Sequence, residues 1–260
     1  VDVGSPFSIF DERFGLEREW RDVAKIQGML YVRGYKGLFA AEQPSPAGSG
    51  SGWRFTRVLE LEPPVWSMVA VGDRLLASSR DGVYELRGTQ PTRLITYRSM
   101  PMTIYRSRSD PARIYVGLVE GVASLRLTDG TWRDEGRLEG IDETITSMAE
   151  GRNGVLWMVS QRQRILRVEF TGPAAAGERE PSQKTPRIRL FSFGRGALTG
   201  RVLVREIAGR PVFLSETGIF EFDSAADRFV PAPGFAALTD AGRSSFSWVA
   251  EDSRGDIWVA

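Results

Sequence analysis

Cysteine and histidine are both absent from this chain of 260 residues. Without cysteine the chain has no disulfide bond, no thiolate nucleophile and no cysteine-ligated metal centre. Without histidine it has no Ser-His-Asp triad, no imidazole that titrates near neutral pH and none of the usual zinc or iron ligands. Most familiar hydrolase chemistry is therefore excluded, and we expect no catalytic residue, no metal and no cofactor.

Long apolar runs and an excess of charge are also missing. No stretch approaches the roughly 20 apolar residues that a membrane-spanning helix needs. The net charge is +1, and the basic residues alternate with acidic ones instead of gathering into the stripe that binds phosphates. We therefore expect neither nucleic-acid binding nor membrane contact by this segment. The 42% of apolar residues suffices for one large core, so we predict a single domain over residues 1–260.

A repeat of about 40 to 50 residues, which is typical of propellers and other repeat arrays, runs along the chain. Each copy has a turn, a short strand with an aromatic or aliphatic anchor, a polar turn with glycine, and a second alternating strand. The anchors are Tyr31, Leu76, Tyr115, Trp157, Phe213 and Trp258. Four short strands fit between successive anchors, and no helical period of useful length is present. The sequence predicts an all-β fold, a β-propeller of four-stranded antiparallel blades.

The two longest repeats and the two chain ends refine this prediction. Segments 42–52 and 171–186 are rich in proline, glycine, serine and alanine, and we interpret both as insertions between third and fourth strands. Residues 6–11 resemble a third strand and Leu16–Trp20 a fourth. Together with the two strands at the C-terminus they would form a composite blade, which gives six blades and removes unpaired sheet edges. The alternative is an incomplete seven-bladed ring.

Two repeats carry a resemblance to a known family. Residues 247–260 read Ser-Trp-Val-Ala-Glu-Asp-Ser-Arg-Gly-Asp-Ile-Trp-Val-Ala, and residues 147–160 read Ser-Met-Ala-Glu-Gly-Arg-Asn-Gly-Val-Leu-Trp-Met-Val-Ser. Both resemble the unit of the two-component regulator propeller family, Ser-Ile-x-Glu-Asp-x-x-Gly-x-Ile-Trp-Val-Gly-Thr. The other four repeats are degenerate versions of it.

The resemblance implies a sensor role. Propellers of this family face outward from the cytoplasmic membrane in bacterial signalling receptors, ahead of an Ig-like domain, a membrane helix and an output domain. It therefore implies a periplasmic, non-enzymatic ligand-sensing domain cut from a larger multidomain receptor. Its protein partners would be those downstream domains and, in a homodimer, a second copy.

The repeated aromatic and acidic positions have structural interpretations that we favour. Period-2 alternation sends the anchor rings into the space between blades, where we expect core packing rather than contact with a sugar. Glu150, Glu206 and Glu251 end the innermost strands and could line a channel mouth or form an acid-base pair. We favour bonds to turn backbone and to arginines for these three carboxylates.

The loops between second and third strands and those between blades share one face of a propeller, and functional sites usually lie on such loops. Candidate ligand-binding residues there are Arg33, Tyr35, Arg80, Arg98, Glu120, Arg162, Arg195 and Glu216. Guanidinium groups suit carboxylate, sulfate or phosphate, so an anionic small molecule or oligosaccharide is the sharper hypothesis. A carboxylate-based glycosidase or lyase and a protein-interaction scaffold are the alternatives, because fold does not fix function.

Overall fold

The structure, a computed structural model, describes residues 12–17, 20–42, 53–58, 64–170, 186–193, 198–235, 246, 249–251 and 254–259. The chain divides into two compact units, Val1–Pro101 and Met102–Ala260. A single domain over residues 1–260 stays a prediction. Among the described residues, no helix is long and apolar enough to cross a membrane.

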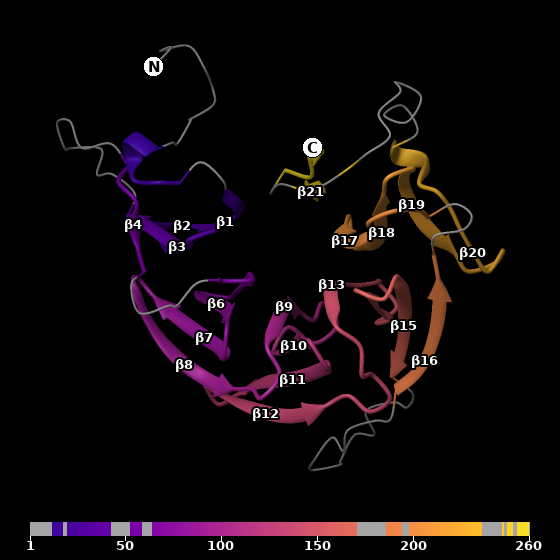
Figure 1. Cartoon of the computed structure of the whole chain (residues 1–260), viewed down its shortest axis with the longest axis horizontal. Coiled ribbons are helices and arrows are strands. Elements are labelled where there is room, and N and C mark those ends of the chain that lie inside the picture. Colours follow the sequence, from indigo (N-terminus) through magenta and orange to yellow (C-terminus); the bar gives the residue numbers. More distant parts are fainter. Residues whose placement is uncertain are drawn as a thin grey trace. The chain divides into compact units, whose positions relative to one another are not determined.

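The first unit contains two four-stranded antiparallel sheets, which Figure 1 shows in indigo and magenta. The strands of the first sheet are β1 (Trp20–Ile26), β2 (Met29–Gly34), β3 (Gly37–Glu42) and β4 (Thr56–Arg57). The strands of the second are β5 (Ser67–Val71), β6 (Arg74–Ser79), β7 (Gly82–Arg87) and β8 (Gln90–Thr96). A short 3-10 helix, η1 (Glu12–Phe14), precedes β1.

The second unit contains three further four-stranded sheets and one sheet of two strands. The first consists of β9 (Pro101–Arg106), whose first residue closes the first unit, β10 (Arg113–Leu118), β11 (Gly121–Thr128) and β12 (Thr131–Arg137). The next sheet consists of β13 (Ile145–Glu150), β14 (Leu156–Ser160), β15 (Arg164–Phe170) and β16 (Pro186–Ser192). The one after it consists of β17 (Leu203–Ile207), β18 (Arg210–Ser215), β19 (Gly218–Asp223) and β20 (Arg228–Pro231). The 3-10 helix η2 (Pro233–Phe235) follows, and β21 (Val249–Glu251) pairs with β22 (Ile257–Val259).

Within every sheet the strands lie in sequence order and each neighbour is antiparallel, which is the meander of a propeller blade. The chain is therefore an all-β protein of propeller architecture, as the repeats predicted, and its described residues form six sheets. The composite blade is not found in the form expected. Residues 6–11 lie outside the described residues, Leu16 and Glu17 belong to no strand, and Trp20 begins β1.

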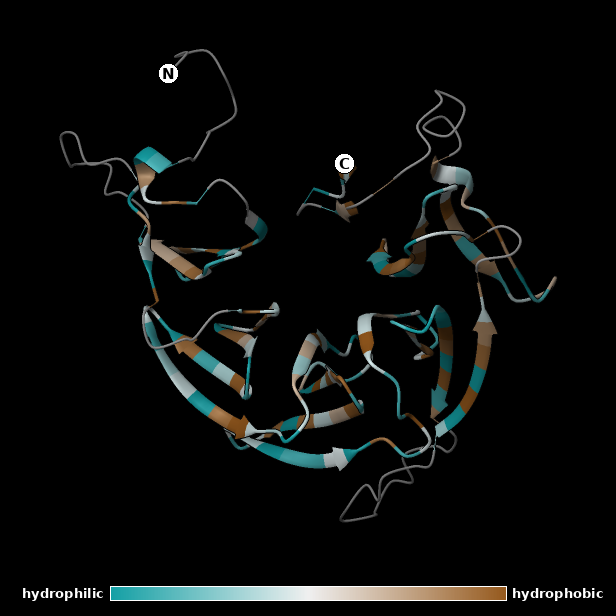
Figure 2. Cartoon of the chain, in the orientation of Figure 1, coloured by the Kyte–Doolittle hydropathy of each residue, from teal (hydrophilic) through white to brown (hydrophobic). Residues whose placement is uncertain are grey.

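The middle strands of the four-stranded sheets are mostly buried, with successive buried residues on both faces. Strands β6 and β7 are buried almost throughout, whereas the fourth strand β8 alternates between exposed and partly exposed residues. Figure 2 shows hydrophilic bands along β8 and β12. The reason is sheet-on-sheet packing. In the first unit one apolar cluster joins the two sheets, and in the second unit three clusters each join two neighbouring sheets. The fourth strands β8 and β12 contain only exposed and partly exposed residues, whereas the strands between two sheets are mostly buried.

The repeated anchors occupy the second strand of each sheet, as predicted. Tyr31, Leu76, Tyr115, Trp157 and Phe213 are at most 4% exposed, so the prediction of core packing is confirmed for these five. The sixth anchor is the exception, because Trp258 is 45% exposed. Its sheet contains only β21 and β22 among the described residues.

The second glycine of the repeat also has a physical reason. A Cβ atom on Gly82 would overlap the backbone carbonyl of Ile95, and one on Gly121 would overlap that of Ile141. These glycines begin β7 and β11, so the third strand starts against the chain that leaves the same sheet. The two insertions fall between third and fourth strands as predicted. Apart from Glu42 and Pro186 they lie outside the described residues.

Replacing Phe213 by alanine should lower the free energy of unfolding by about 3 to 5 kcal/mol. The ring of Phe213 is fully buried, and its centroid lies 5.3 Å from that of the Trp157 ring and 4.9 Å from that of the Phe229 ring. Urea unfolding followed by tryptophan fluorescence measures this change. Leu190→Ala is the control, since Leu190 on β16 is 51% exposed, and should cost less than about 0.5 kcal/mol. Equal losses in both variants would contradict the packing described.

Candidate functional site

The turns between second and third strands are where the repeats placed them. Tyr35, Arg80, Glu120, Arg162 and Glu216 all lie in these turns and are exposed. Arg98 lies in the segment after β8 and is also exposed. The placement of Arg33 in a loop is corrected by the structure, because Arg33 lies on β2. Its side chain is 15% exposed, and its Nε lies 4.0 Å from Asp22 Oδ2. Strand pairing holds it away from the turn.

An open hollow of about 660 Å³ lies against one of these turns in the first unit. Its lining residues are Glu12, Gly15, Leu16, Glu17, Tyr35, Lys36 and Phe39. Tyr35 is 71% exposed, the largest value among the large hydrophobic side chains described. The turn is fixed by the Glu17 carboxylate, which accepts the backbone N–H of Lys36 at 2.9 and 3.1 Å.

Of the candidate residues taken from the sequence, Tyr35 lines this hollow, and the opposite wall was not predicted. Leu16 was interpreted as part of a strand, whereas it follows η1 and packs into a cluster with Val32 and Phe55. The backbone N–H of Phe55 donates to Phe14 O at 2.7 Å, which holds this segment near the end of β3. These contacts join parts of the chain far apart in sequence, so no local pattern revealed them.

The neighbouring turn of the first unit carries a polar triad. Tyr84 donates to Asp81 Oδ1 at 2.9 Å, and Arg93 donates from Nε to the Tyr84 hydroxyl at 3.0 Å. Arg93 Nη2 also lies 3.1 Å from Asp81 Oδ2. Burial, followed by the hydrogen bond to Asp81, raises the pKa of the Tyr84 hydroxyl, which therefore remains protonated and donating. The Asp81 carboxylate is consequently committed to Tyr84 and Arg93.

In the second unit the corresponding turns are tied to the linkers between blades. Thr144 Oγ1 donates to Val119 O at 2.7 Å, and the N–H of Gln161 donates to Thr144 O at 2.9 Å. The adjacent Glu143 is buried and accepts Arg164 Nη1 at 2.8 Å. The turns that carry Glu120 and Arg162 are thereby both fastened to one linker. Arg195 lies outside the described residues.

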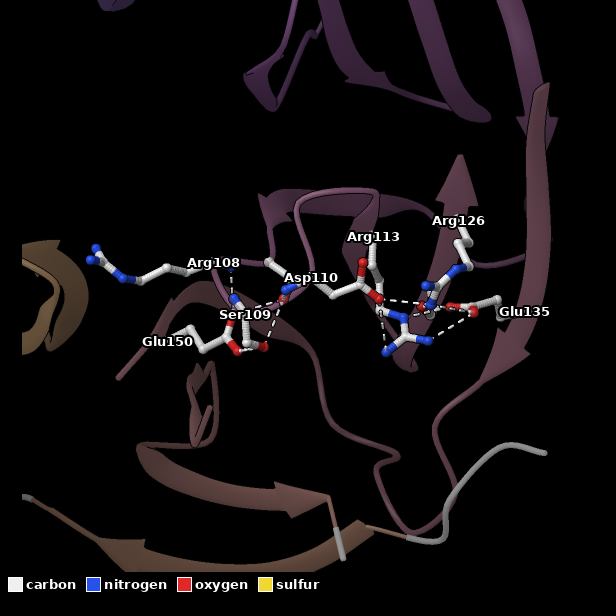
Figure 3. A network of polar contacts seen from close by, with 9 residues as sticks. Arg108, Ser109, Asp110, Arg113, Arg126, Glu135 and Glu150 are labelled. Carbon is white, nitrogen blue, oxygen red and sulfur yellow. Dashed lines mark hydrogen bonds and ion pairs between the residues drawn. The ribbon is translucent and has the colours of Figure 1, made fainter. Parts of the chain in front are cut away.

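The three glutamates at the ends of inner strands make the structural bonds that we favoured. The Glu150 carboxylate accepts Ser107 Oγ at 2.8 Å, the backbone N–H of Arg108 at 2.6 Å and the Ser109 hydroxyl. Figure 3 shows Glu150 beside Arg108 and Ser109 on the segment between β9 and β10. Glu251 likewise accepts the backbone N–H of Ala208, in the turn between β17 and β18, at 2.6 Å.

Glu206 is held by a tyrosine and an arginine from the sheet of β9. Tyr105 donates to Glu206 Oε2 at 2.6 Å, and Arg108 Nη1 donates to Glu206 Oε1 at 2.7 Å. Burial raises the pKa of the Tyr105 hydroxyl strongly, with the neighbouring Glu206 adding to the shift, so Tyr105 stays a donor. The hydroxyl also accepts the backbone N–H of Glu150 at 2.9 Å. This network therefore links β9, β13 and β17 and engages the carboxylates of Glu150 and Glu206, while Glu251 is engaged separately by Ala208.

A second polar network, also in Figure 3, crosses the sheet of β9 to β12. Glu135 accepts Arg113 through both oxygens, at 2.8 and 2.9 Å, and accepts Ser124 Oγ at 2.5 Å. Asp110 accepts Arg126 Nη1 at 2.7 Å. Partial burial alone would raise the pKa of Glu135, but the bonds from Arg113 and Ser124 outweigh it and lower the pKa below its ordinary 4.5.

Glu150→Gln should lower the free energy of unfolding by about 1 to 3 kcal/mol, because the amide replaces an acceptor with a donor that faces Ser107, Arg108 and Ser109. Chemical denaturation measures the loss. The control is Glu216→Gln, an isosteric change in an exposed turn, which should stay within about 0.5 kcal/mol. A neutral Glu150→Gln would refute the anchoring role.

The lowered pKa of Glu135 predicts that the free energy of unfolding depends on pH. Its pKa is lower in the folded than in the unfolded chain, so its contribution is fully present above its ordinary value of 4.5 and is lost as pH falls through the folded value. Glu135→Gln should therefore be less stable than the original chain at pH 7, and the difference should shrink below about pH 4. Denaturation midpoints across pH 3 to 7 test this prediction, and a constant difference would contradict it.

No family model matches the chain, and no curated protein matches its sequence. Solved structures do match. A catalytically inactive variant of virginiamycin B lyase from Staphylococcus aureus, crystallised with quinupristin, is 10% identical, with a TM-score of 0.60 over 93% of this chain and 76% of the lyase. The β-propeller domain of Cps50 (Swd1) from Myceliophteria thermophila is 11% identical, with a TM-score of 0.57 over 93% of this chain and 80% of that chain.

An extracellular domain of a putative one-component system from B. thetaiotaomicron also matches. It is 14% identical, with a TM-score of 0.54, and the match covers 93% of this chain but 37% of that one. Identities of 10 to 14% carry information about the fold alone. The comparisons establish that this chain has the β-propeller fold, which is shared by proteins of different function.

Proposed function

We propose that this chain is an extracytoplasmic ligand-sensing propeller of a bacterial signal-transduction receptor, which binds a small molecule or oligosaccharide without chemical conversion. The observation that carries the proposal is the hollow beside Tyr35 and Lys36. It lies on one of the turns that the repeats predicted as binding loops, and its volume of about 660 Å³ falls in the range of about 300 to 1,000 Å³ typical of small-molecule sites.

The chemistry of the hollow suits a ligand with a flat apolar face and hydroxyl groups. The exposed Tyr35 ring offers a stacking surface and a hydroxyl that both donates and accepts. Lys36 supplies a donor, and Glu12 and Glu17 supply acceptors on the other wall. A sugar ring presents the matching combination of an apolar face and an edge of hydroxyls.

The sensor role rests on two further supports. The repeats at residues 147–160 and 247–260 resemble units of the two-component regulator propeller family. The structural likeness to the extracellular domain of a putative one-component system covers 93% of this chain. A periplasmic location and partner domains in a longer receptor are parts of the same proposal.

A lyase or glycosidase is the second candidate, and the likeness to virginiamycin B lyase is the observation that favours it. The inactive variant of that lyase carries a histidine-to-alanine substitution, whereas this chain contains no histidine. In this chain Glu150, Glu206 and Glu251 are engaged in structural bonds. A binding function therefore has the better support.

The test is a thermal-shift screen of the chain against neutral and anionic oligosaccharides, amino acids and organic acids. A ligand at 100 times its dissociation constant adds about 2.7 kcal/mol of stability, which raises Tm by about 5 to 10 °C for a chain of this size. Tyr35→Ala and Lys36→Ala should each weaken binding of a hit at least tenfold. Lys25→Ala is the matched control, since Lys25 is an exposed lysine on β1 outside the hollow, and should leave binding unchanged.

Hits that bind equally well to Tyr35→Ala would remove the site from the hollow. Product formation from a hit, detected by mass spectrometry, would favour the enzymatic alternative. Silence across the whole panel with a cooperatively folded protein would contradict the sensor proposal and favour the scaffold.

A further inference from the structure

The hollow lies on the face of the first sheet that is turned away from the second sheet. Phe39 on β3 lines the hollow and belongs to the apolar cluster that contains Leu16 and Phe55. Leu38 and Ala40, the neighbours of Phe39 on β3, belong instead to the cluster that joins the first sheet to the second. Successive side chains of a strand point to opposite faces, so Phe39 and the hollow share the far face.

Arg57 lies on this same face, beside the hollow. Strand β4 pairs Arg57 with Phe39, and directly paired residues of antiparallel strands place their side chains on one face. Arg57 Nε lies 3.4 Å from the position that a Cβ atom on Gly37 would occupy. Gly37 directly follows Lys36, which lines the hollow. The guanidinium group of Arg57 is therefore next to the turn that carries Tyr35 and Lys36.

The positive groups at this turn are free, whereas the carboxylates of the hollow are engaged. Lys36 and Arg57 are exposed, and their side chains have no hydrogen-bond or ion-pair partner in the described part of the chain. Glu17 accepts the backbone N–H of Lys36 with both oxygens and lies against Gly34, where a Cβ atom would overlap the carboxylate. Glu12 also makes an interaction within the chain.

Unused hydrogen-bonding capacity therefore distinguishes these groups, because the four formal charges of Glu12, Glu17, Lys36 and Arg57 cancel. The carboxylates keep lone pairs that can accept sugar hydroxyls, but part of their capacity is already taken. The ammonium and guanidinium groups have all of their N–H donors available. An acidic group of a ligand is the partner that both of them lack.

We infer that Lys36 and Arg57 bind an acidic group, a carboxylate or a sulfate ester, of a sugar whose ring stacks on Tyr35. A guanidinium offers paired N–H donors to two oxygens of such a group, and an ammonium adds a compact positive charge. All three side chains are exposed and can be reached by a ligand in the open hollow. The inference rests on the proposed function and narrows its ligand to acidic sugars.

The first experiment compares glucose, glucuronate and glucose 6-sulfate, which have the same pyranose ring and differ only in the group at carbon 6. Each sugar is titrated into the full chain at constant ionic strength set with sodium chloride. Binding is followed by the signal of the Lys36 backbone amide in a proton–nitrogen NMR spectrum. At least one acidic sugar should bind about tenfold tighter than glucose, because charge-assisted hydrogen bonds are the strong ones. The tighter of the two acidic sugars distinguishes a carboxylate from a sulfate ligand.

Variants locate the acidic group. Arg57→Gln and Lys36→Gln should each reduce the preference for the acidic sugar over glucose about fivefold or more, and Arg57→Glu should reverse it. Arg133→Gln is the matched control, because Arg133 is an exposed arginine on the fourth strand of another sheet, β12, and should keep the full preference. A preference that is the same in Arg57→Gln, Lys36→Gln and the control would overturn the inference.

Salt dependence tests the ionic nature of the contact without any substitution. The preference for the acidic sugar should be largest in about 0.01 M sodium chloride and should shrink in about 1 M, where charges are screened within about 3 Å. Glucose binding should change little over this range. A preference that is constant across the range would contradict an ionic contact with Lys36 and Arg57.

The outcomes separate this inference from the proposed function. Sugars that depend on Tyr35 but bind equally well with and without the acidic group would overturn the inference and leave the sensor standing. No saturable binding of any of the three sugars would also overturn it, while ligands from the wider panel that depend on Tyr35 would still support the proposed function.

Discussion

The burial of both faces of the middle strands is the constraint on which the rest of the structure depends. A single four-stranded sheet with residues such as Leu75, Leu76 and Ala77 in succession cannot satisfy both faces alone. It has to be covered by a sheet on each side, and repetition of the unit supplies those sheets. The anchor side chain of the second strand is the centre of each contact, which is why the repeat is recognisable although only two copies have tryptophan there. The same demand explains the fourth strands, which face outward and are free to be polar.

The inner strands need a second kind of support, because their ends carry backbone groups that the sheet does not pair. Glu150 and Glu251 meet this need by accepting N–H groups from the turn of the preceding sheet, at Arg108 and at Ala208. A carboxylate is suited to the task since it accepts several donors at once and its bonds are charge-assisted. This use of glutamate also explains why an acidic residue recurs at one repeat position.

Much of the fold could be predicted because its determinants are local. The anchors, the glycine at the start of the third strand and the insertion positions are each defined within one repeat, and each was located correctly apart from the covering of Trp258. The hollow could not be predicted, since its far wall depends on Leu16 packing with Phe55, and on Glu17 reaching Lys36. Arg33 was misplaced by only two residues, but at the end of a strand that distance separates a paired side chain from an exposed turn.

The abundance of arginine was a weak guide to ligand chemistry for a related reason. Arg113, Arg164 and Arg189 each face a carboxylate, so their positive charges are compensated within the fold. The amino-acid composition does not distinguish these ion-paired arginines from Arg80 and Arg98. Only uncompensated charge attracts an anion over the distance at which a ligand approaches. The significant observation is therefore the position of an arginine that the fold does not use. Arg80 and Arg98 are in such positions: both are exposed, neither has a counter-ion among the described residues, and the carboxylate of the neighbouring Asp81 is engaged by Tyr84 and Arg93.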